Sequence, residues 1–181
     1  MNKSFLALLL ILSFGITSNS EKVIARQGQV SFFSYTSVEN IKAENNQVYS
    51  IINLQEGTIA VDMLMNAFVF EKALMREHFN ESYIESDIYP KATFQGKIID
   101  FDTNAQGTQI KMIKGAFKMH GVSKDIEIKT KIENNNGSYT LSGVFETFVK
   151  DYNINIPPLL AGNIAKSIAV NFKFEYQPYE N

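Results

Sequence analysis

Two histidines, His78 and His120, are the side chains of this chain best suited to acid–base chemistry or metal binding. Zinc sites combine several ligands at set spacings, often two His one helical turn apart. Glu77 and His78 are adjacent, so on a helix they point to different sides, and His120 precedes Gly121 in a predicted turn, where a ring can cap backbone groups. The sequence has neither a Gly-x-Ser-x-Gly motif nor a carboxylate pair with an evident partner. We therefore predict no catalytic residue, no metal and no cofactor.

Aromatic and thioether side chains form a second group with functional potential. The chain has 14 Phe, 8 Tyr and 6 Met, and thioethers adapt to flexible apolar ligands. The candidate contacts to an apolar ligand are Met63, Met65, Phe68, Phe70, Leu74, Phe79, Tyr83, Phe94, Phe145, Tyr152, Leu159 and Leu160. The candidate contacts to a polar head group are His78 and Asn153. Many bulky residues also serve as filler, the role expected for Ile126, Ile128, Val170 and Phe172.

Apolar and polar residues alternate along most of the chain from Gln29 onward. In Asp125–Ile132, isoleucines occupy three of the even positions and charged residues the odd ones. This pattern is typical of a strand with one dry face and one wet face. We expect the isoleucines inside and Glu127, Lys129 and Lys131 in water. The following Asn134–Gly137 has the residues that a tight hairpin turn requires.

Eight segments share this alternation and are predicted strands. They are Gln29–Ser37, Val48–Asn53 with a short piece at Lys42–Asn45, Thr58–Met65, Ala92–Phe101, Thr108–Met119, Asp125–Ile132, Tyr139–Thr147 and Ile168–Tyr176. Eight antiparallel strands are enough to close a barrel whose interior holds one small ligand. The sequence therefore predicts an all-β fold, an eight-stranded antiparallel barrel.

Two segments depart from the alternation. The first is Phe68–Asn80, whose spacing predicts a short amphipathic helix near 70–80, with Phe70, Leu74 and Phe79 directed inward over the barrel rim. The second is the loop Asp151–Gly162, which is unusually apolar for a solvated loop. We expect its Leu159 and Leu160 to face the same opening.

The N-terminus has the pattern of a secretory signal peptide at residues 1–20, followed by a single domain at 21–181. Lys3 precedes an apolar run from Phe5 to Ile16, too short for the ~20 residues that span a bilayer, and small polar residues follow. This predicts a periplasmic or secreted protein. The chain has no Cys and 17 Lys and Arg, or 16 without Lys3, against 19 Asp and Glu. Such a surface has no clustered cations to favour nucleic acid, so we predict no such partner.

Three stretches carry a family resemblance. They are Glu77-His78-Phe79-Asn80 through Phe94, Gly115 to Lys124, and Phe148 to Ile154. In this order, and on an eight-strand pattern, they resemble the YceI-like family over roughly Val30 to Tyr176. The resemblance implies a secreted, lipocalin-like barrel that binds a long apolar molecule, such as a polyisoprenoid or another lipid, without catalysis.

Two other classes of function stay open on sequence grounds. A membrane-embedded β-barrel would show the same alternation, with its apolar face toward lipid. An enzyme of unrecognised type would use His78. The sequence also leaves open whether the protein forms a homodimer.

Overall fold

The computed structural model describes residues 22–35, 40–156 and 167–179. The predicted signal peptide at 1–20 and the candidate contacts Leu159 and Leu160 lie outside these residues. Within the described ranges there are nine strands: β1 (Lys22–Ser34), β2 (Ile41–Asn53), β3 (Thr58–Leu64), β4 (Val69–Phe70), β5 (Lys91–Ile98), β6 (Gly107–Met119), β7 (Val122–Asn135), β8 (Ser138–Phe148) and β9 (Ser167–Pro178). The helical elements are η1 (Met65–Ala67), α1 (Ala73–His78), η2 (Phe79–Tyr83) and η3 (Val149–Tyr152).

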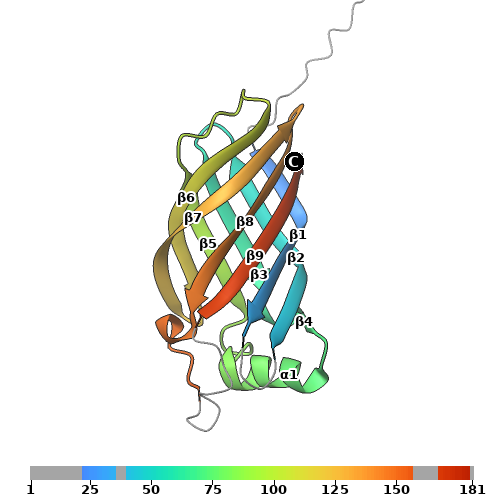
Figure 1. Cartoon of the computed structure of the whole chain (residues 1–181), viewed down its shortest axis with the longest axis vertical. Coiled ribbons are helices and arrows are strands. Elements are labelled where there is room, and N and C mark those ends of the chain that lie inside the picture. Colours follow the sequence, from blue (N-terminus) through green and yellow to red (C-terminus); the bar gives the residue numbers. More distant parts are fainter. Residues whose placement is uncertain (1–21, 36–39, 157–166, 180–181) are drawn as a thin grey trace, which may run out of the picture.

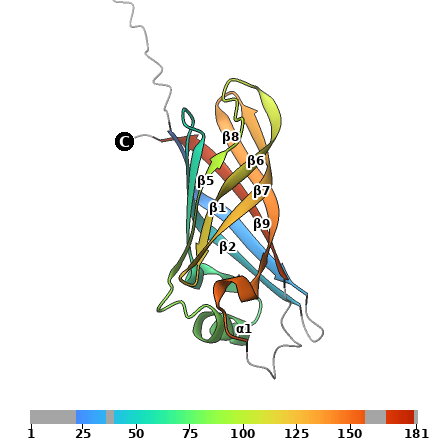
Figure 2. The ribbon, with the colours of Figure 1, turned by 90° about the vertical axis from the view of Figure 1, so that its left-hand side faces the viewer.

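The eight long strands form a closed antiparallel barrel. Their order is β1-β9-β8-β7-β6-β5-β3-β2, the pairing of β2 with β1 closes the circle, and β4 is an additional short strand beside β2. Figures 1 and 2 show the strands tilted around one axis, with α1 across the end that we call the lower end. The predicted all-β, eight-stranded antiparallel barrel is confirmed.

The first two strands are longer and more continuous than predicted. β1 begins at Lys22 instead of Gln29, and β2 is one strand instead of two pieces. The cause is a register shift where the strands pair, near Arg26-Gln27 and Asn46-Gln47. At each place two successive residues are exposed, and the inward positions change from odd to even. A β-bulge of this kind breaks the two-residue period, so the sequence pattern is interrupted although the strand continues.

Asn45 organises the bulge of β2 and is fully buried, at 0% exposure. Its Nδ2 donates a hydrogen bond to the carbonyl oxygen of Leu64 at 2.9 Å, and its Oδ1 accepts one from the backbone N–H of Gln47 at 2.9 Å. β2 pairs with β3 over Tyr49–Asn53 but with β4 at Ala43 and Glu44. Asn45 therefore lies where β2 exchanges one partner for another.

The strand that decides which face of the barrel is inside behaves as predicted. In β7, Ile128 and Ile132 are buried and Ile126 is half-buried, whereas the charged residues between them are exposed. The turn that follows has Asn136 and Gly137 at φ values of 54° and 88°. Positive φ at both central residues is the geometry of the type I′ hairpin.

The short helix predicted near 70–80 is confirmed, but it does not include the residues before Ala73. Val69 and Phe70 form β4 instead, because the lower part of β2 offers them a strand edge. Since α1 begins only at Ala73, Leu74 lies on its outer face and is 60% exposed, contrary to expectation. Met75 and Phe79, one turn apart, are half-buried and lie on the opposite face of the segment from Leu74.

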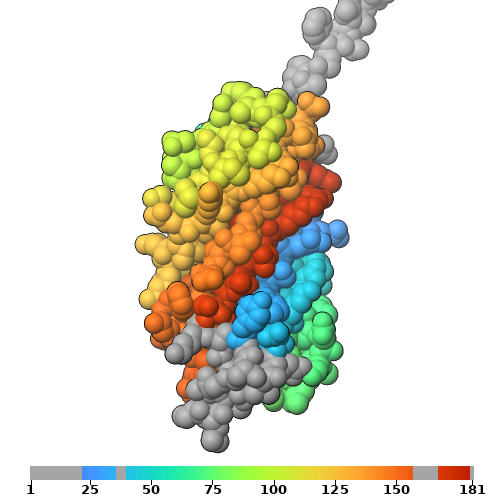
Figure 3. Space-filling model, viewed as in Figure 1, coloured from blue at the N-terminus to red at the C-terminus, as the bar shows by residue number. Residues whose placement is uncertain are grey.

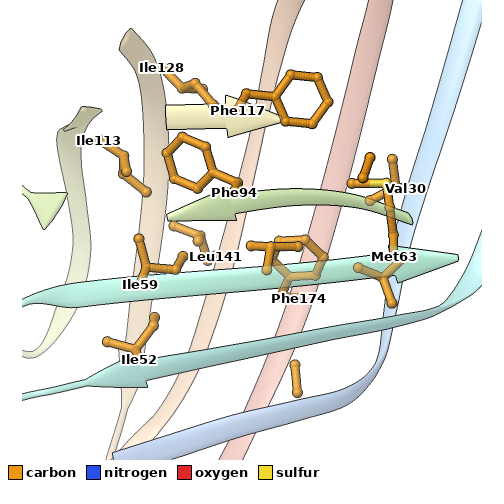
Figure 4. Close-up of a cluster of buried hydrophobic side chains, with 14 of the residues drawn as sticks. Val30, Ile52, Ile59, Met63, Phe94, Ile113, Phe117, Ile128, Leu141 and Phe174 are labelled. Atoms are coloured by element: carbon orange, nitrogen blue, oxygen red, sulfur yellow. The ribbon is translucent and has the colours of Figure 1, made fainter. Parts of the chain in front are cut away.

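The upper half of the barrel is filled by side chains. Its most deeply buried apolar residues include Ile52, Ile98, Ile132 and Leu141, and Figure 4 shows Ile52, Ile59 and Leu141 converging with Phe174 inside the barrel. One polar contact crosses this core: Tyr176 Oη lies 2.6 Å from Ser50 Oγ, which itself donates to the carbonyl of Ala60. Burial raises the pKa of the Tyr176 phenol well above its ordinary value.

Because the Tyr176 phenol is buried, we predict that the free energy of unfolding falls at alkaline pH. Below about pH 10, the pKa of tyrosine in an unfolded chain, Tyr176 is neutral in both states and its contribution is fully present. As the pH rises further, only the unfolded chain ionises, so the free energy of unfolding falls by up to ~1.4 kcal/mol per pH unit for each such tyrosine. Urea unfolding between about pH 8 and pH 11 measures this slope. Tyr176→Phe should reduce it and Tyr49→Phe, at an exposed position of β2, should not; equal slopes in all three proteins would refute the assignment.

Candidate functional site

The lower half of the barrel contains a cavity of about 300 Å³ between the barrel wall and the segment from η1 to η2. This volume lies at the lower end of the ~300–1,000 Å³ of small-molecule sites. The lining residues are Val30, Phe32, Ser34, Ile41, Met63, Met65, Phe68, Phe70, Met75, His78, Phe79, Tyr83, Ile84, Ala92, Phe117, Met119, Phe145, Thr147, Val149, Ile154, Ile156, Ile168 and Val170. No Asp, Glu, Lys or Arg is among them, so the cavity suits an uncharged, mainly apolar molecule.

Four phenylalanines form one wall of the cavity. Phe32 from β1 stacks on Phe79 with ring centroids 5.6 Å apart and contacts Phe68 at 5.3 Å. Phe70 meets Phe79 at 5.0 Å and Phe32 at 5.9 Å. These rings tie β1, β4 and η2 together at the lower end, because each aromatic pair adds to the stabilisation that burial provides.

A buried serine is the unusual polar group of this site. Ser34 is at the lower end of β1, is 1% exposed and lines the cavity, yet its Oγ makes no hydrogen bond. Among the described residues one other buried side-chain oxygen, Asn80 Oδ1, is also without a partner; Asn80 does not line the cavity. Leaving a buried hydroxyl unsatisfied costs roughly 1–3 kcal/mol. A ligand with a hydrogen-bonding group would remove that cost.

The structure brings most of the predicted contact residues together. Met63, Met65, Phe68, Phe70, Phe79, Tyr83, Phe145 and His78 all line the cavity. Phe94 lies deeper, in a space of about 40 Å³ that shares Phe145 and Met63 with the larger cavity. Leu74 and Asn153 are exposed and outside the lining, and Asn153 adopts a left-handed conformation after η3. Tyr152 is buried outside the lining, its ring 5.6 Å from that of Phe117.

Several lining residues were not singled out from the sequence, among them Phe32, Ser34, Met75, Phe117 and Met119. Val170, predicted to be filler, also lines the cavity. The alternation in β1 places Phe32 and Ser34 on the inward face with Val30. Alternation does not indicate the height in the barrel at which the side-chain core ends. That height determines which of the inward residues face a cavity.

His120 fastens the two segments that frame the cavity. Its Nδ1 lies 2.8 Å from the carbonyl oxygen of Tyr152 in η3, and its Nε2 lies 3.0 Å from Glu85 Oε2 in the loop after η2. The ring also packs against Tyr89, with centroids 4.3 Å apart. Both hydrogen-bond partners are acceptors, one a backbone carbonyl and the other a carboxylate. The expectation that this ring can cap backbone groups holds for one of them, the carbonyl of Tyr152.

No three His, Cys, Asp or Glu side chains in the described ranges come close enough together to hold a metal ion. No helix in the described part of the chain is long and apolar enough to cross a membrane.

Comparison with known proteins gives a consistent result. The family model for the YceI-like domain matches residues 14–176. A comparison with curated proteins found no match. Among solved structures, a polyisoprenoid binding domain from Saccharophagus degradans implicated in plant cell wall breakdown has 14% identity and a TM-score of 0.75, covering 88% of this chain and 99% of that one. BcnA from Burkholderia cenocepacia has 13% identity and a TM-score of 0.70, covering 83% and 96%. The YCEI protein of Campylobacter jejuni has 15% identity and a TM-score of 0.59, covering 81% and 90%. At these identities the likeness shows a shared fold.

The two histidines should differ in their effect on stability. His120→Ala removes one buried and one partly buried hydrogen bond. It should lower the free energy of unfolding by about 2 kcal/mol, with faster amide exchange in residues 79–90 and 149–156. His78→Ala, at an exposed position of α1, should change stability by less than about 0.5 kcal/mol. Urea unfolding and hydrogen exchange measure both effects. Unchanged exchange in the two segments of the His120 variant would show that the histidine does not hold them.

Proposed function

This chain belongs to the YceI-like family, and from that premise we propose that it binds one apolar ligand non-covalently inside its barrel. The single observation that carries the proposal is the cavity of about 300 Å³, whose walls are almost entirely apolar. The polyisoprenoid binding domain with the same fold supports a polyisoprenoid or another lipid as the ligand class. The protein is a carrier with no catalytic residue, metal or cofactor.

The physical basis of binding is the removal of apolar surface from water. Each Å² of apolar surface buried contributes about 25 cal/mol, and a flexible hydrocarbon meets both rigid rings and adaptable thioethers in this cavity. Met63, Met65, Met75 and Met119 supply the thioethers, which follow irregular apolar shapes at low cost. The site therefore favours shape-tolerant binding of hydrocarbon over recognition of one rigid molecule.

Ser34 supports a more specific description of the ligand. Its unpaired hydroxyl is the buried polar group of an otherwise apolar wall, and a few polar groups commonly fix the orientation of a ligand in such sites. Because the lining contains no Asp, Glu, Lys or Arg, the ligand has an uncharged polar end, such as a hydroxyl, carbonyl or amide. His78 and Tyr83, which also line the cavity, are further contacts for that end.

The alternatives fit the structure less well. A barrel embedded in lipid has an apolar outer band, whereas the outer face of β7 carries exposed Glu127, Lys129 and Lys131. An enzyme that uses His78 would need a charged or nucleophilic partner beside it. Among the described residues that line the cavity, the candidates are the hydroxyls of Ser34, Thr147 and Tyr83, and none of the lining residues is Asp, Glu, Lys or Arg. The signal-peptide pattern at 1–20 supports export, so we place the carrier in the periplasm or outside the cell.

A charge in the cavity wall should abolish binding. Phe70→Asp places a carboxylate against an apolar ligand that offers no partner, and should weaken lipid binding at least about tenfold. Leu74→Asp is the matched control, because it introduces the same charge nearby on the exposed face of α1 and should bind as the wild type does. Native mass spectrometry of protein purified from its own host measures retained lipid. Wild-type protein that retains and rebinds no apolar molecule would refute the carrier function.

Ser34→Ala should have opposite effects on stability and binding. Removing an unpaired buried hydroxyl should stabilise the ligand-free protein by about 1 kcal/mol, and should weaken binding of a fatty alcohol or amide by roughly threefold to tenfold. Binding of a pure hydrocarbon of similar length should not change. Urea unfolding and displacement of a fluorescent lipid measure these effects. Equal losses for polar and non-polar ligands would show that Ser34 only shapes the cavity.

A further inference from the structure

The barrel wall is not hydrogen-bonded along its whole length. β7 and β8 pair from Asn135 and Ser138 at the hairpin down to Thr130 and Gly143. Below that level the described strands diverge: β7 continues beside β6 as far as Val122, and β8 continues beside β9 as far as Phe148. Figure 1 shows the two strands together at the upper end and apart further down. η3 contacts both strands below the gap, so the gap is a slit in the side of the barrel.

Spaces lie on both sides of the wall at the slit. Outside, at the point of divergence, a hollow of about 420 Å³ lies on the face that Figure 3 shows, over β7, β8 and β9. Inside lies the deeper space of about 40 Å³, which shares Phe145 with the large cavity. Phe172 lines both the outer hollow and the inner space. Phe172 is thus the residue that the linings of the two spaces have in common.

Gly143 gives the ring of Phe172 its position. A Cβ atom at Gly143 would lie 2.6 Å from Cζ of Phe172, so the ring occupies the space that a side chain would otherwise fill. The ring stacks on Phe174 at 5.5 Å and meets Phe145 at 6.5 Å. It is held by ring contacts instead of hydrogen bonds, and a rotation about its side-chain bonds would move it out of the slit.

The outer rim of the slit is partly apolar. Val144 is 57% exposed, and Ile110 is also exposed on the other side of the hollow. Lys129, at the same rim, offers an aliphatic stem while its amine stays in water. A hydrocarbon that leaves the barrel here would meet apolar surface instead of bare backbone.

A long ligand needs such an exit. The upper end of the barrel is closed by buried residues such as Ile132 and Leu141 and by the contact of Tyr176 with Ser50. The interior volume suits only a small ligand, so an apolar chain longer than the cavity has to project from the barrel. The slit offers such a chain a path past Phe172 to a rim with exposed apolar side chains.

We propose that the slit between β7 and β8 is a lateral exit for the far end of a long apolar chain, with Phe172 as its gate. This inference rests on the proposed carrier function and deepens it. The polar end of the ligand stays near Ser34, the chain runs past Phe145, and its end lies in the outer hollow. The ligand class is therefore a linear chain that is longer than the cavity.

Two photoreactive ligands test the proposal on the wild-type protein. Octanol and octadecanol, each with a diazirine on the last carbon, are bound and cross-linked, and the labelled residues are identified by mass spectrometry. The octanol derivative should label cavity residues such as Met65 and Phe79. The octadecanol derivative should label Val144, Ile110 or Phe172. Labelling by both derivatives confined to the cavity and its lower mouth would overturn the lateral exit.

A matched pair of variants provides the second measurement. Val144→Asp should weaken octadecanol binding roughly tenfold and leave octanol binding unchanged, because only the longer chain reaches the rim. Tyr49→Asp, at a similarly exposed position (55%) on β2, should alter neither. Unchanged octadecanol binding in Val144→Asp would also overturn the exit. If the wild type binds neither alcohol, the carrier function itself fails, whereas octanol binding without labelling at the slit rejects the exit alone.

Discussion

The hydrogen bonds of the buried Asn45 side chain hold β2 at the point where it leaves β3 and takes β4 as its partner. Above this point the barrel is a regular sheet with a filled interior. Below it, the chain from η1 to η2 crosses the lower end and brings Phe68, Phe70 and Phe79 toward the barrel axis. A buried amide satisfied at both ends is a specific device, since an apolar residue in its place would leave the carbonyl of Leu64 without a partner. The cavity depends on this change of partners.

The filled upper half and the hollow lower half of the barrel interior have different physical causes. In the upper half, aliphatic side chains from neighbouring strands interdigitate to near-complete burial, as in an ordinary protein core. In the lower half, the inward residues meet an aromatic wall that comes from another part of the chain, and their own side chains do not reach across. His120 then holds the two covering segments to the β6–β7 turn. The site is thus a consequence of how the lower end is covered as well as of the barrel itself.

Local pattern was sufficient to predict the eight strands, the Asn136-Gly137 turn and the orientation of β7, because each depends on residues that are close in sequence. Long-range pairing was not predictable in this way. β4 forms because a distant edge of β2 is available, and this pairing delays the helix and turns Leu74 outward. Likewise, the bulge near Asn46 interrupts the alternation of apolar and polar residues, so the sequence pattern does not show that β2 is one continuous strand. Of the candidate contacts, those in the apolar run from Met63 to Phe70 were identifiable. Phe32 and Ser34 were not, because alternation indicates a face but not the height at which the core ends.

The position of β1 between β2 and β9 has a consequence for how the molecule forms. The first strand of the barrel needs the last one, so its second edge stays unpaired until β9 has been made available. Contacts between residues so far apart in sequence cost loop entropy before they stabilise anything, and such topologies fold slowly. The cavity, enclosed in part by Ile168 and Val170 of β9, is therefore completed only at the end of folding. A chain without β9 lacks this wall of the cavity, so the proposed binding of ligand requires the whole barrel.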